Sequence, residues 1–190
     1  MSSVAAPFGI RPVFSTTGTV RPGPLAAIES AYATNVYQNG PVAVDANGFL
    51  VAAAAGDRAL GVFQGVEYND LATGRRFYLN KWTASVALPS VGADMRAYWT
   101  IDQPGLVYEV QANDTLTRAA IGQQYDWTAL AGNDVTGLSS VALDVASAAA
   151  NAGLRVIGLN PGPDNDWGDD FPIVLVQFSQ HQYTADIASV

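Results

Sequence analysis

The chain has 190 residues, of which 49% are hydrophobic and only 14% are charged, and its formal net charge at pH 7 is −8. This length allows one domain with a sizeable core, and the low charged share, against about 25% in an average protein, indicates surfaces covered by other subunits. The excess of acid excludes nucleic acid as a partner, because it repels phosphates, and no apolar run approaches the roughly 20 residues that span a membrane.

The first 25 residues contain four prolines and three glycines, a composition that does not favour a regular helix. They also carry apolar side chains that a disordered linker would not concentrate. We therefore predict an extended N-terminal arm over residues 1–25 that becomes ordered on another protein. The expected contact residues are Phe8, Ile10, Arg11, Val13, Phe14 and Arg21. The alternative is an arm that folds back over its own domain; on the preferred interpretation, deletion of residues 2–20 leaves a folded domain.

From residue 26 onward, short apolar segments alternate with turn residues, a pattern typical of strands. The first strands are expected around residues 36–37, 42–44 and 49–53. A longer strand is expected over residues 59–68, where Gly61 and Gly65 predict a bulge or a sharp bend. Such bends allow a sheet to close into a barrel.

Further strands are expected over residues 75–88, 95–102 and 106–112, and the turn residues 102–105 predict a hairpin between the last two. Residues 139–153 are ambiguous, because alanine favours a helix while the alternating valines and leucine favour a strand. We prefer a strand followed by a loop of small residues.

The last two strands are expected over residues 154–159 and 173–183, on either side of an acidic loop. Many short strands with closely spaced turns are typical of an all-β fold, here a small antiparallel β-barrel or sandwich. The domain is expected to cover residues 26–183, after the extended N-terminal arm and before a C-terminal tail over residues 184–190.

The acidic loop lies in the segment GPDNDWGDDFP, residues 162–172. A calcium-binding EF-hand loop needs oxygen ligands at positions 1, 3 and 5 and a glutamate at position 12. Counted from Asp164, positions 5 and 12 fall on Gly168 and Leu175, so the spacing does not fit. We expect an ordinary hairpin loop, with neither a metal nor a cofactor.

The sequence offers no arrangement of residues typical of catalysis. His181 is the only histidine, and its strand position predicts an exposed or rim residue. Lys81, beside Trp82, is interpreted as a solvated or stacked side chain. Nucleophile-elbow and phosphate-binding motifs are missing, and without cysteine there is no thiolate chemistry or disulfide. We therefore do not expect an enzyme.

Two parts of the chain resemble small β-barrel proteins encoded by tailed bacteriophages. Residues 30–68, which include VYQNGPV and GDRALGVFQGVEY, resemble the start of these proteins, and GLRVIGL, PDNDWGDDFP and IVLVQFSQHQY are similar to their end. The resemblance covers most of residues 7–183. It implies a virion structural protein of the head decoration (capsid cement) family, which binds and stabilises the outer surface of the shell as trimers at local threefold positions.

The partners that this resemblance implies are the major capsid protein and further copies of the chain in a homotrimer. The implied location is the outer capsid surface of the virion, after synthesis in the host cytoplasm, for which the lack of a signal-peptide pattern also argues. Two alternatives stay open. The four tryptophans and eight tyrosines suggest a glycan-binding surface module of the virion, although core packing also explains them. A tail or head-completion structural protein with a similar fold is the other alternative.

Overall fold

Antiparallel β-sheets make up almost all the regular structure of the protein. The computed structural model describes residues 4–15, 18, 27–88, 95–101 and 105–186. The all-β antiparallel class expected from the sequence is confirmed. Over the described residues the sheets are open rather than closed into a barrel, so the sandwich alternative fits better.

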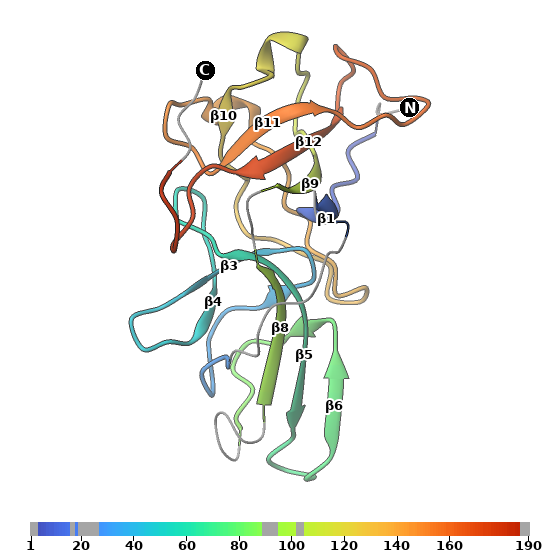
Figure 1. Ribbon diagram of the computed structural model, residues 1–190. Helices are drawn as coiled ribbons and strands as arrows, with labels where there is room; N and C mark the ends of the chain where they lie inside the picture. The colour runs from blue at the N-terminus through green and yellow to red at the C-terminus, as the bar shows by residue number, and fades with distance from the viewer. Residues whose placement is uncertain (1–3, 16–17, 19–26, 89–94, 102–104, 187–190) are drawn as a thin grey trace.

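The first sheet has the strand order β1-β9-β12-β11-β10 and lies at the top of Figure 1. Its members are β1 (Arg11–Ser15), β9 (Leu106–Gln111), β10 (Gln124–Tyr125), β11 (Leu154–Leu159) and β12 (Ile173–Phe178). Every neighbouring pair is antiparallel. β9 is buried along its whole length, since it lies between β1 and β12. The expected pairing of β11 and β12 around the acidic loop is confirmed.

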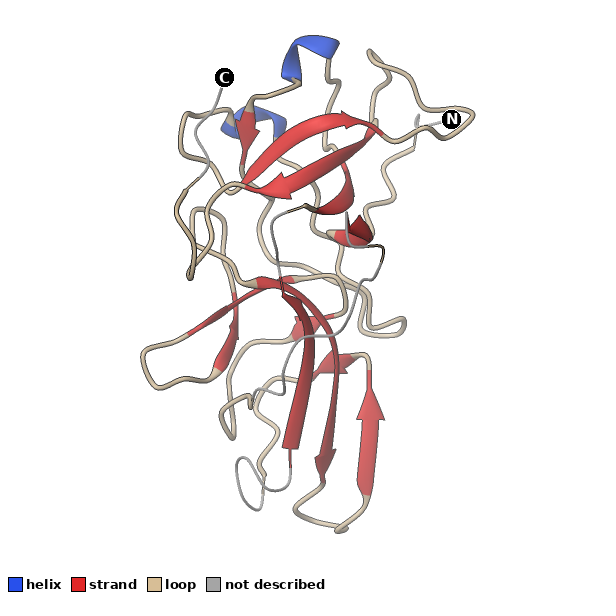
Figure 2. Cartoon of the chain, in the orientation of Figure 1, coloured by secondary structure: helices blue, strands red, loops and turns tan. Residues whose placement is uncertain are grey.

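The second sheet has the order β4-β3-β5-β6, and β8 pairs with the other side of β5. Its members are β3 (Pro41–Val44), β4 (Leu50–Ala52), β5 (Gly61–Asn69), β6 (Arg76–Leu79) and β8 (Met95–Ile101). A short ribbon joins β2 (Val36–Tyr37) to β7 (Lys81–Trp82). The only helical turns in the described ranges are two 3₁₀ turns, η1 (Arg118–Ala120) and η2 (Val145–Ser147), drawn in blue in Figure 2.

The predicted bulge in the long strand is confirmed at Gly65. The pairing of β5 with β8 shifts register between Phe63 and Gly65. Gly65 has φ +154°, and a Cβ there would lie 3.0 Å from the carbonyl oxygen of Leu79. The backbone angle therefore favours glycine, and the close approach of β6 leaves little room for a Cβ.

Two strand predictions are wrong. β8 and β9 do not form a hairpin, because β8 pairs with β5 in the second sheet while β9 pairs with β1 and β12 in the first. The turn residues 102–104 lie outside the described residues. The segment 139–153 forms isolated bridges and η2 instead of a strand, and the Asp144 side chain caps that turn by accepting from the Ala146 N–H.

The core has two apolar clusters, and at the junction between the sheets Ala43 and Val62 of the second sheet pack into the first cluster. The first cluster includes Trp127 and Phe178, and the second includes Phe63 and Trp82. At the junction the Trp127 indole N–H donates to the carbonyl of Ala53, 3.1 Å away. The protein is therefore one continuous structure with two packed halves. No helix in the described ranges is long and apolar enough to cross a membrane.

Candidate interaction surface

The N-terminal segment is attached to its own domain rather than extended away from it. β1 is hydrogen-bonded to β9, and the Ile10 N–H donates to the carbonyl of Asn39 at 2.8 Å. The Ile10 side chain has no exposed surface and belongs to the first apolar cluster. The prediction that Ile10 is an anchor for another protein is therefore wrong. For residues 4–15 the structure supports the alternative, in which the segment folds back over its own domain.

Arg11 and Phe8 hold the same segment in place. The Arg11 guanidinium bonds to the buried carboxylate of Glu109 on β9 and lies over the Phe8 ring, 4.8 Å from its centroid. Asn160 also donates to Glu109. A buried carboxylate needs such partners, because desolvation disfavours its charge. Both residues, predicted to contact a capsid, thus have a role within the chain.

Gln111 on β9 fixes the residues that precede β1. Its amide donates to the carbonyl of Val4 at 3.0 Å and accepts from the Ala6 N–H at 2.8 Å. It also donates to the carbonyl of Phe171 at 3.3 Å. Sequence reasoning missed this residue, because one glutamine in an apolar strand carries no recognisable signal.

Val13 and Phe14, which we call the β1 patch, are the apolar residues among the predicted contacts that are exposed. Their exposed fractions are 42% and 47%. The Arg11 side chain is also 56% exposed but is paired with Glu109. Within the described ranges, β1 pairs with β9 alone and forms an edge of the first sheet (Figure 1, dark blue). Arg21, the last of the predicted contact residues, lies outside the described residues. An exposed apolar edge strand is a common site of protein association.

The buried side chain of Asn165 organises the acidic loop. The buried Asn165 amide donates to the carbonyls of Asn160 and Ile173, both at 2.8 Å, and accepts from the Ile173 N–H at 2.9 Å. These three bonds replace strand pairing where β11 and β12 separate. Within the described ranges, no group of three or more histidine or acidic side chains is placed to hold a metal ion.

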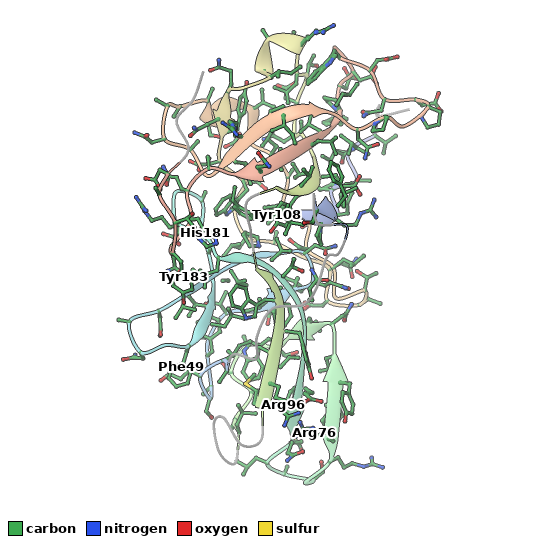
Figure 3. The ribbon with its side chains drawn as sticks, viewed as in Figure 1. Phe49, Arg76, Arg96, Tyr108, His181 and Tyr183 are labelled. Atoms are coloured by element: carbon green, nitrogen blue, oxygen red, sulfur yellow. The ribbon has the colours of Figure 1, made fainter. Side chains whose placement is uncertain are left out.

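His181 lies at the junction of the two halves, and the prediction of an exposed residue is wrong. It is only 4% exposed (Figure 3). Its Nε2 lies 3.2 Å from the carbonyl oxygen of Leu60, and its Nδ1 accepts from the Tyr183 N–H at 3.1 Å. In this arrangement the ring is neutral, with the proton on Nε2. Burial lowers the pKa of His181, and the bond to Leu60 only partly offsets this effect.

Protonation of His181 is expected to destabilise the fold at mildly acidic pH. A folded-state pKa below the ordinary value of 6.5 means that the unfolded chain binds the proton more readily. The free energy of unfolding should therefore fall as the pH drops below about 6.5 and stop falling below the folded pKa. Thermal unfolding of the wild type and of His181→Gln, at pH values from 7.5 to 5, measures this. A wild-type slope that persists in the variant would assign the effect to other groups.

Lys81 forms a specific contact rather than a solvated one. Its ammonium donates to the Asp134 carbonyl at 2.7 Å and to the Asp134 carboxylate at 3.1 Å. The Tyr37 hydroxyl donates to the same carboxylate at 3.0 Å. The hydrogen bonds from Lys81 and Tyr37 and the lysine charge lower the pKa of Asp134. This group of residues fastens the 131–139 loop to β2 and β7.

An open cleft of about 570 Å³ lies between the β3–β4 hairpin and the C-terminal segment. Its polar side chains bond within the chain: Gln182 exchanges two hydrogen bonds with the Val44 backbone, Asp57 accepts from the Ala54 N–H, and Arg58 pairs with Asp186. Tyr183 at its rim is 69% exposed (Figure 3). The cleft therefore offers an aromatic ring but few polar groups without partners.

Comparison with known proteins leaves the chain without an assigned family. No family model matches it. No curated protein and no solved structure matches it either. The resemblance to phage head proteins therefore stays a prediction.

Proposed function

We propose that the protein is a bacteriophage head decoration protein, which binds the outer surface of the capsid and stabilises the shell. Its partners are the major capsid protein and further copies of itself in a homotrimer. The resemblance of residues 30–68 and 153–183 to phage head proteins suggests this function. The low charged share and the acidic balance support it, because such a protein is largely covered by neighbours and lies away from packaged DNA.

One observation carries the proposal furthest: a firmly held edge strand with an exposed apolar patch. Ile10, Arg11 and Gln111 bind the N-terminal segment to the domain, so the β1 patch is presented on a rigid base. A surface already ordered before binding loses little conformational entropy when it docks. The β1 patch therefore suits a capsid contact better than a free arm would.

Replacing the β1 patch is expected to release the protein from heads without unfolding it. Val13 and Phe14 are each already about half buried, so complete burial contributes about 1 kcal/mol per side chain. The loss of about 2 kcal/mol in Val13→Ser/Phe14→Ser should weaken binding about thirtyfold per copy. Sedimentation of purified protein with heads that lack it, followed by quantification of the bound protein, measures this.

The matched control is Val135→Ser, because Val135 is 95% exposed and lies in the turn that Lys81 holds. We expect it to bind heads like the wild type. The copy number in purified virions tests the function itself and should approach that of the major capsid protein. Absence of the protein from virions would refute the function. If Val13→Ser/Phe14→Ser binds heads as fully as the wild type, the β1 patch is not the contact surface, but the decoration function still stands.

A second candidate function is glycan binding at the cleft beside Tyr183. The exposed Tyr183 ring favours it, since sugar rings stack on aromatic faces. Against it stand the internal bonds of Gln182, Asp57 and Arg58, which occupy the polar groups that a sugar would need. A glycan-array signal abolished by Tyr183→Ser would establish this function in place of the proposed one only if the protein also fails to bind heads.

A further inference from the structure

One face of the second sheet gathers arginine and tyrosine side chains. Glu67 on β5 is paired directly with Tyr78 on β6 and with Arg96 on β8. Because cross-strand partners share a face and alternate residues return to it, Arg76 and Tyr98 lie on this face as well. We call these five residues the arginine–tyrosine face. Figure 3 shows Arg76 and Arg96 close together at the lower end of the molecule.

The arginine–tyrosine face carries an excess of positive charge. The Glu67 carboxylate accepts from Arg76 at 3.0 Å and from Arg96 at 3.4 Å, so one carboxylate serves two guanidinium groups. Desolvation raises the pKa of Glu67. The hydrogen bonds from Tyr98 and Arg76 and the charges of Arg76 and Arg96 have a larger effect together, so the pKa is lowered overall. Glu67 is therefore ionised at neutral pH, and the three charged groups sum to +1.

The exposure of this face leaves donors and an aromatic ring open to a partner. The Arg96 side chain is 53% exposed, and Tyr78 is 73% exposed. Each guanidinium has five N–H donors in a planar fork that matches a carboxylate. Arginine and tyrosine are also among the residues enriched at the centres of protein interfaces. The face is thus suited to a protein surface that presents carboxylates.

The chain itself provides such a surface at its other end. The acidic loop contains four aspartates between residues 164 and 170, and no lysine or arginine follows Arg155. Asp166 and Asp170 are exposed. Figure 1 shows the β11–β12 connection at the upper end of the molecule and β5, β6 and β8 at the lower end, so one copy cannot join its own two surfaces.

We propose that the arginine–tyrosine face of one copy binds the acidic loop of the next copy, head to tail. The inference rests on the proposed homotrimer, and it names the two surfaces that meet. A contact between two different surfaces joins copies head to tail. The chain of copies closes into a ring when the rotation from one copy to the next is a whole fraction of a full turn, as in a trimer. The net charge of −8 on each chain makes copies repel, so complementary charge at this contact also selects the orientation.

The test is a charge-reversal cycle on the full chain. Tyr78→Glu/Arg96→Gln changes the charge of the face from +1 to −1, and Asp164→Lys/Asp166→Lys/Asp170→Lys changes that of the loop from −4 to +2. Either set of changes alone should weaken self-association about tenfold or more, because like charges then meet. Both sets in one chain should restore association, since the acidic face then meets the lysines of the next copy. Sedimentation velocity over a range of protein and salt concentrations measures this, and wild-type association should weaken as salt rises.

Tyr183→Ser is the matched control, because Tyr183 is 69% exposed and Figure 3 shows it apart from Arg76 and Arg96. Arg96→Gln alone tests the face by removing a charge without adding an acid. Thermal unfolding verifies that every variant is folded. Three results would overturn the inference: a wild type that stays monomeric, a loop reversal without effect, or a combined variant that associates no better than either set of changes alone. Head binding is measured separately. If the wild type does not bind heads but the charge-reversal variants behave as expected, the decoration function is contradicted and the contact between copies still stands.

Discussion

Replacing Trp127 with alanine should destabilise the protein by about 3–5 kcal/mol. The Trp127 side chain has no exposed surface and packs edge-on against Phe178, with ring centroids 6.0 Å apart. Its indole N–H bonds to the carbonyl of Ala53, which follows β4 of the second sheet. The substitution therefore leaves a cavity in the first apolar cluster and removes a hydrogen bond at the junction of the sheets.

For a chain of this length, each kcal/mol lowers the melting temperature by about 2–4 °C, so Trp127→Ala should melt roughly 10 °C below the wild type. Trp127→Phe, which keeps most of the apolar volume but not the N–H, should lose about half as much. Tyr183→Ala is the control for an exposed aromatic residue. If Trp127→Ala melts within 2 °C of the wild type, the junction does not depend on this side chain.

Deletion of residues 2–15 should destabilise the domain by about 5 kcal/mol and expose an edge of β9. Loss of the Ile10 side chain alone accounts for about 2–5 kcal/mol, because it is completely buried. Removal of Arg11 also leaves the buried Glu109 with one partner fewer. Since a typical domain is stable by only 5–15 kcal/mol, the truncated protein should be partly unfolded or prone to aggregate.

The proline-rich sequence predicts that the truncated domain stays folded and loses only capsid binding. The structure leads us to expect the opposite, a truncated domain that is destabilised. Chemical denaturation followed by tryptophan fluorescence measures the difference. Val13→Ser/Phe14→Ser serves as the control on the same strand: the buried half of each side chain contributes about 1 kcal/mol, so the double change should cost about 2 kcal/mol, well below the truncation. A truncated protein with wild-type stability would show that the segment is an independent arm after all.

The sequence by itself predicted the features that depend on neighbouring residues. The strands near residues 36–37, 42–44 and 59–68 follow from alternating apolar residues between turn residues. The bulge at Gly65 follows from a glycine inside such a run. The hairpin of β11 and β12 was predictable because two apolar segments flank residues 160–172, which are rich in turn residues. Each of these features has its cause in one short stretch of the chain.

The tertiary structure alone decided which strands pair and which side chains are buried. β8 and β9 are adjacent in the chain but belong to different sheets, because β9 is buried along its length and takes a central place between β1 and β12. Ile10 and His181 meet buried partners such as Asn39 and Leu60, which lie far from them in the sequence. The arginine–tyrosine face likewise exists only because β6 and β8 pair with opposite sides of β5. Local propensity does not encode such long-range contacts, since the free energy of burial depends on what the rest of the chain brings to the same place.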